Sequence, residues 1–142
     1  MAGARLRVLL LCDDWSGHAS TVLEHIGAFT RLSRHDVRSF NPRGLRDSVA
    51  LDLDEFDVVV IHYSLILSND NYVAPAFRHK LHRFRGLKVQ FIQDEYRWVD
   101  RATAAMRDIG GLRVERAAAS AGLGSRCSRS RGSGSTSTGR SS

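Results

Sequence analysis

FDVVVIHY, residues 56–63, is the clearest buried strand in the sequence. Its continuous apolar run is typical of a parallel strand that is covered on both faces. Residues 7–12 form a second run of this kind, and residues 87–92 are a third candidate for a buried strand. Residues 36–40 indicate a short strand, which the turn at Asn41-Pro42-Arg43-Gly44 closes. These four segments predict an open parallel sheet.

Stretches with helical spacing lie between the predicted strands. Apolar residues recur three or four positions apart over residues 19–33, 73–84 and 99–109. Ser68-Asn69-Asp70-Asn71 supplies capping residues for the second helix, and Gly86 ends it. The alternation of strands and helices predicts a Rossmann-like α/β domain over residues 1–110.

The pattern requires one more strand after residue 110, and we expect none. Residues 111–142 contain nine Ser, six Gly, six Arg and no aromatic residue. This composition buries too little apolar surface to offset an ordering entropy of about 1–2 kcal/mol per residue. We therefore expect a sheet that is incomplete at its C-terminal end, followed by a disordered tail. The excess of 19 Arg over two Lys favours a truncated or frame-shifted end over a native linker.

The basic charge is concentrated in this tail. The chain carries a formal charge of +6, but residues 111–142 hold six Arg and one Glu, which leaves +1 for residues 1–110. A nucleic-acid interface requires cations clustered on an ordered element, with aromatic residues where a single strand is bound. We therefore expect no specific nucleic-acid partner.

The two cysteines, Cys12 and Cys127, predict no disulfide and favour a reducing compartment. The apolar run before Cys12 is too short for a signal sequence or a membrane span. We therefore expect a cytoplasmic chain.

Candidate functional residues follow the predicted strands, because ligands of an open parallel sheet bind beyond the carboxyl ends of its strands. Three polar clusters stand at these positions: Asp13-Asp14-Trp15-Ser16-Gly17-His18, His62-Tyr63-Ser64 and Gln93-Asp94-Glu95-Tyr96-Arg97-Trp98.

In the first cluster, Gly17 permits a tight turn, and Ser16 to Ser20 lie where a helix N-terminus presents N–H groups to an anion. The alternative is a loop whose serine caps the helix. The cluster has too few glycines for a dinucleotide fingerprint, and the chain has no Walker motif.

In the second cluster, His62 is a candidate proton acceptor or phosphate contact, or else a histidine satisfied by backbone at a strand end. In the third, Asp94 or Glu95 is a candidate general base and Trp98 a stacking surface for a sugar. The alternative is a helix cap worth about 0.3–1 kcal/mol. The remaining histidines lack the spacing of a metal site and are expected on solvated surfaces: His25, His35, His79 and His82.

The stretch from Arg7 to Gly110 resembles the N-terminal half of bacterial glycosyltransferases of the two-domain GT-B type. The resemblance rests on residues 8–32, on residues 56–64 and, most specifically, on VQFIQDEYRW at 89–98. It implies an acceptor-side domain that requires no metal or other cofactor. The donor-binding half is missing, so nucleotide-sugar and acceptor are expected partners only when that half is present, and whether this chain is itself an enzyme stays open. On this resemblance we assign catalysis to Asp94 and Glu95, and substrate binding to Gly17, His18, His62 and Trp98.

The first cluster also resembles part of a phosphoacceptor receiver domain, a signalling module in which paired acids hold Mg²⁺. Asp13 and Asp14 would be the paired acids. His62 stands where the phosphorylated aspartate is expected, so this alternative is a degenerate receiver-like or interaction module.

Overall fold

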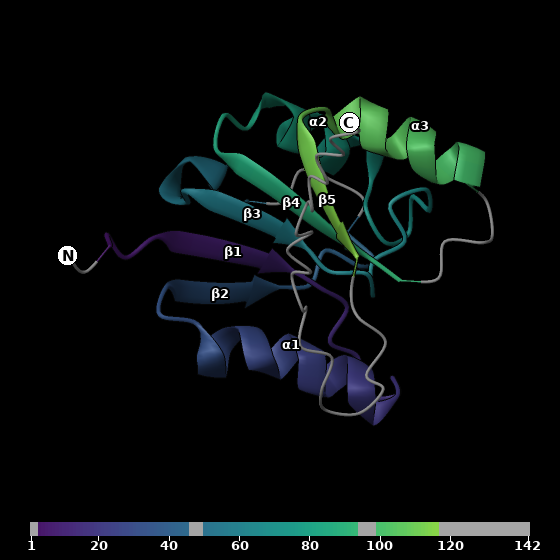
Figure 1. Cartoon of the computed structure of the whole chain (residues 1–142). Helices are drawn as coiled ribbons and strands as arrows, with labels where there is room; N and C mark the ends of the chain where they lie inside the picture. The colour runs from purple at the N-terminus through teal and green to yellow at the C-terminus, as the bar shows by residue number, and fades with distance from the viewer. Residues whose placement is uncertain (1–2, 46–49, 94–98, 117–142) are drawn as a thin grey trace, which may run out of the picture.

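The computed structural model describes residues 3–45, 50–93 and 99–116. In these ranges strands and helices alternate along the chain (Figure 1). The strands are β1 (Arg7–Leu11), β2 (Asp36–Phe40), β3 (Val58–Ile61), β4 (Leu87–Ile92) and β5 (Leu112–Arg116). The helices are α1 (Ser20–Leu32), α2 (Pro75–Arg83) and α3 (Val99–Ile109), with a short 3₁₀ turn, η1, at Leu53–Glu55.

All five strands are parallel and their order in the sheet is β2-β1-β3-β4-β5. The chain first builds outward from β1 to β2, then crosses back to place β3 on the other side of β1. This is one of the two common strand orders of doubly wound α/β folds. The predicted α/β fold class is confirmed.

Helices cover the sheet on both faces, with α1 on one and α2 and α3 on the other (Figure 1). The larger core lies under α2 and α3, where Leu9, Val59 and Ile61 meet Phe77 and Leu81. The smaller core lies under α1, where Ile26 packs with apolar residues of β1 and β3. The continuous apolar runs are thus explained by burial on both faces.

The sheet does not stop at β4, as the sequence led us to expect. β5 pairs with β4 in parallel register, from Lys88↔Leu112 to Ile92↔Arg116. Gly110 and Gly111 have φ of 66° and 60°, a conformation that glycine adopts without strain, and they turn the chain from α3 into β5. Most residues of β5 are charged, so its sequence lacks the apolar run by which the central strands were predicted. The expected tail of residues 111–142 was therefore wrong for Leu112–Arg116, and residues 117–142 lie outside the described residues.

The second helix begins later than its capping residues indicated. α2 starts at Pro75, and no side chain caps it at Ala74. The preceding loop is held by Arg78, which donates to Leu67 O (3.1 Å) and Val73 O (2.8 Å) and pairs with Asp70 (2.8 Å). Asp70 therefore fixes a loop instead of a helix start. Within the described ranges no helix is long and apolar enough to cross a membrane.

Candidate functional site

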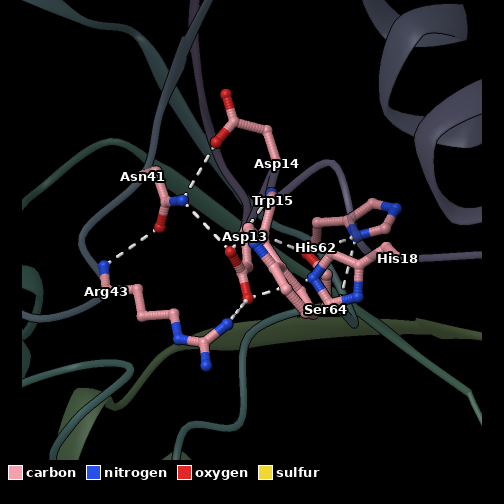
Figure 2. A network of polar contacts seen from close by, with 8 residues as sticks. All are labelled: Asp13, Asp14, Trp15, His18, Asn41, Arg43, His62 and Ser64. Carbon is pink, nitrogen blue, oxygen red and sulfur yellow. Dashed lines mark hydrogen bonds and ion pairs between the residues drawn. The ribbon is translucent and has the colours of Figure 1, made fainter.

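The candidate site lies at the carboxyl ends of β1, β2 and β3 (Figure 2). The connection after β1 leads to β2 on one side, and the connection after β3 leads to β4 on the other, so the loops that follow β1 and β3 diverge at this point. Such a switch point is where doubly wound folds bind their ligands. Three loops contribute polar groups here, which include Asp13, Asn41 and Ser64.

Asp13 is the centre of the cluster and is fully buried. Its carboxylate accepts from Arg43 Nη1 (2.7 Å), from Asn41 Nδ2 (3.1 Å) and from the N–H of Trp15 (3.4 Å), and His18 Nε2 lies 3.0 Å away. Burial alone would raise the pKa of Asp13, but these contacts outweigh it and lower the pKa. Asp13 is therefore a charged anchor that orients the groups around it.

Arg43 connects the buried Asp13 carboxylate to the protein surface. Its side chain is 42% exposed although Nη1 is bound to Asp13. The guanidinium lies 4.8 Å from the centre of the Tyr72 ring and 5.9 Å from that of Trp15. Its own backbone N–H donates to Asn41 Oδ1 (3.0 Å). The Asn41-Pro42-Arg43 turn is therefore held by this bond within it and by the bond from Arg43 to Asp13. The result is a cation held in place near two aromatic rings.

The loop from β1 to α1 exposes an aromatic ring beside a helix end. Trp15 is 59% exposed, and its indole lies so close to Gly17 that a Cβ there would stand 2.4 Å from the ring. His18 meets the same ring edge-on at 5.8 Å. Ala19 is the N-cap residue of α1 and offers no side-chain acceptor to the first N–H groups of the helix. The alternative of a serine cap is therefore wrong.

Behind the cluster, His62 is fully buried in a chain of hydrogen bonds. Its Nδ1 accepts from the N–H of Ser64 (3.0 Å) and contacts Ser64 Oγ (2.9 Å), while its Nε2 lies 2.8 Å from His25 Nδ1. The N–H of Asp13 donates to Ser64 Oγ (2.9 Å), which links this chain to the carboxylate cluster. Burial, and secondarily the nearby His25 and His18, lower the pKa of His62 to about 4. The pair is neutral at pH 7.

The structure brings Gly17 and His18 into the cluster, and places His62 behind it without exposure to solvent. The other predicted site residues, Asp94, Glu95 and Trp98, lie outside the described residues.

Sequence reasoning missed Arg43, Asn41 and His25. The first two stand in the turn directly after a predicted strand, which is a usable signal at this edge of a sheet. His25 was expected on a solvated surface and instead contacts His62.

The receiver-like interpretation is not supported by this geometry. Mg²⁺ requires carboxylate oxygens that are open to the ion, whereas those of Asp13 are engaged by Arg43 and Asn41. Where the phosphorylated group would stand, His62 is buried and bound to His25. Within residues 3–45, 50–93 and 99–116, no group of three potential ligands could hold a metal ion.

Comparisons with known proteins give little support for any family. No family model matches the chain, and no curated protein does. Among solved structures, a flavoprotein in complex with FMN from Lactobacillus acidophilus NCFM is similar with a TM-score of 0.46 and 13% identity. The match covers 80% of this chain and 91% of that chain. A likeness this distant carries no argument about what this chain binds.

The glycosyltransferase interpretation is wrong. None of these comparisons finds a glycosyltransferase, and the matching structure is described as a flavoprotein. The resemblance rested most heavily on residues 89–98, of which half lie outside the described residues. The alternation of strands and helices, which it also used, is common to every doubly wound fold and identifies no activity.

Proposed function

We propose that the chain is a binding domain for a small phosphate-bearing molecule with a planar ring, of the mononucleotide kind. The observation that carries this proposal is the placement of Arg43, which stands in the turn after β2, is fixed by buried Asp13 at the end of β1 and lies 5.9 Å from the Trp15 ring. In flavodoxin, which has this strand order, FMN binds at the switch point between β1 and β3, beside the end of β1.

The start of α1 supplies the phosphate-binding part of the proposed site. The first turn of α1 contains no acidic residue, and the Ala19 side chain offers no acceptor for the free N–H groups of that turn. Such a helix end carries a partial positive charge and donors that point at an anion. A phosphate bound there would lie beside the loop that contains Gly17, whose missing side chain leaves room for the Trp15 indole.

Trp15 and Arg43 supply the ring-binding part. An indole that is 59% exposed leaves a large apolar face in water, which a planar ring can cover by stacking. Arg43 is already oriented by Asp13, so little side-chain entropy is lost when it meets the ligand. Both groups lie on loops that a rigid sheet positions, as is typical of binding sites.

The same cluster favours binding over proton transfer. Asp13 is fully buried and its carboxylate is engaged by Arg43, Asn41 and the Trp15 N–H. His62 is buried as well, and its pKa of about 4 makes it a weak base at pH 7. A ligand is therefore held here by groups that keep their protonation states.

Isothermal titration calorimetry with FMN and with AMP tests the proposal. The two ligands share a phosphate and differ in their ring. Riboflavin and adenosine, which lack the phosphate, are the matched controls and should bind at least about tenfold more weakly, since a charge-assisted contact is lost. Failure of both phosphorylated ligands to bind would sink the proposal.

Arg43→Gln should weaken the binding of either ligand by about tenfold or more, because a fixed cation is removed from the site. Arg38→Gln is the matched control, since Arg38 lies on β2 with a side chain that is 67% exposed, and we expect no change. Equal affinities for the wild type and Arg43→Gln would place the ligand elsewhere.

We further propose a cytoplasmic location. The support is the cysteine content: Cys12 is buried as a free thiol in the core, as reducing conditions allow. Fractionation of cells that express the tagged chain tests this, and recovery in an exported fraction would contradict it.

A further inference from the structure

β5 forms one edge of the sheet. It pairs with β4 on one side, and no strand in the described part of the chain pairs with its other side. Four of its five residues are exposed, and Val114 is 45% exposed. An edge of this kind presents unpaired N–H and C=O groups that can bind another strand.

The two faces of β5 differ in chemistry. Arg113 stands beside Val89, which packs into the core under α1, so Arg113 and Glu115 belong to the α1 face. Within one chain, Arg113 Nε lies 3.3 Å from Glu115 Oε1. Val114 belongs to the opposite face, because successive side chains of a strand alternate.

We propose that β5 pairs antiparallel with β5 of a second copy of this chain, about a two-fold axis at Val114. In this register Arg113 of each copy stands opposite Glu115 of the other, and the two Val114 side chains meet on the other face. Opposite charges directly across an antiparallel pair stabilise it, and like charges destabilise it. Two sheets would then join edge to edge as a two-fold symmetric dimer.

Charge selects the register, and exposure selects the edge. An axis at Arg113 or at Glu115 would place two like charges opposite each other, so among these positions only Val114 gives attraction on both sides. The other edge strand, β2, carries a similar triplet, Asp36-Val37-Arg38, but Asp36 and Val37 are only half-exposed. Arg113, Val114 and Glu115 are all exposed, so β5 is the more accessible self-complementary edge.

Sedimentation velocity over a range of concentrations tests this proposal on the full chain, with a reductant present to prevent disulfide formation through Cys127. The wild type should associate as its concentration rises toward about 1 mM, where weak interfaces form. Arg113→Glu and Glu115→Arg should each weaken association by about tenfold, because attraction becomes repulsion at both cross-strand pairs.

Mixing the two variants in equal amounts should restore the dimer, since one copy then presents two acids and the other two bases. The double exchange R113E/E115R should also restore it. Circular dichroism shows whether each variant is folded, and amides of β5 should become protected from hydrogen exchange as concentration rises. A wild type that stays monomeric throughout, or single variants that associate as the wild type does, would overturn the proposal.

Discussion

The two ends of the sheet bury charge in different ways. At the carboxyl end, Asp13 is held by side chains from two loops, which include the partly exposed Arg43. At the amino end, Lys88 is 7% exposed, and its Nζ donates to Ile109 O (3.1 Å) and Leu81 O (3.3 Å). Asp13 therefore meets side chains that reach the surface, whereas Lys88 meets the backbone of two helix ends.

Because of this difference, we assign Asp13 to the candidate binding site and Lys88 to stabilisation of the fold. Lys88 binds carbonyls in the last turns of α2 and α3. A cation there offsets the negative end of each helix dipole. Burial lowers the pKa of Lys88, so its charge is held at some cost. Asp13 instead organises groups that solvent and ligands can reach. Of the two buried charges, only Asp13 has a partner that a ligand can reach, the partly exposed Arg43.

The largest expected effect is a loss of stability at acid pH, caused by His62 at the carboxyl end of the sheet. Because His62 has a pKa of about 4 in the folded chain and about 6.5 when unfolded, the unfolded state binds more protons between these values. The contribution of His62 to the free energy of unfolding is therefore fully present above pH 6.5. It falls by about 3 kcal/mol as the pH drops to 4. Urea titrations at several pH values measure it. In His62→Gln the fall should be smaller, and an unchanged slope would contradict the assignment.

Removal of the buried carboxylate should give the next largest effect. Asp13→Asn keeps the shape of the side chain but leaves Arg43 and His18 without a charged partner, and we expect a loss of about 2 kcal/mol in unfolding free energy. Asp70→Asn is the matched control, because Asp70 pairs with Arg78 at 2.8 Å while 68% exposed, and should cost about 0–1 kcal/mol. Equal losses would show that burial of Asp13 adds nothing.

The amino end should respond more weakly. Lys88→Met retains the packing of the side chain and removes a charge whose burial is costly, but it leaves the Leu81 and Ile109 carbonyls without their donor. We expect a net loss of about 1–2 kcal/mol in thermal or urea unfolding. A variant as stable as the wild type would mean that desolvation of the ammonium cancels its two hydrogen bonds.

The smallest effect on stability is expected at Trp15. Because its side chain is 59% exposed, Trp15→Ala should change the unfolding free energy by less than about 0.5 kcal/mol. The same variant should bind FMN and AMP more weakly in calorimetry. A large loss of stability would assign the ring to the fold instead of to the ligand.

The sequence was sufficient to predict most of the sheet, because residues 7–12, 56–63 and 87–92 carry the apolar signal of buried strands and a strong turn at Asn41-Pro42-Arg43-Gly44 marks the end of the short strand at 36–40. It was insufficient for β5, where Arg113, Glu115 and Arg116 surround a single Val. An edge strand need not be apolar, so periodicity and composition do not distinguish it from a loop.

For the candidate site, the sequence placed Asp13, Gly17 and His18 at the correct edge. It could not pair Asp13 with Arg43, or His25 with His62, since these partners are 30 and 37 positions apart and meet only through the strand order. The pairings depend on long-range topology, which local patterns do not encode.

The buried thiol of Cys12 makes opening of the sheet measurable by chemical modification. The thiol is fully buried, and burial, followed by the nearby Asp14 and Asp13, raises its pKa to about 12. It is therefore unreactive toward alkylating reagents while the sheet is closed, because the thiolate is the reactive form. Its rate of alkylation in native buffer, measured separately from that of Cys127, consequently reports how often the strand β1 is exposed.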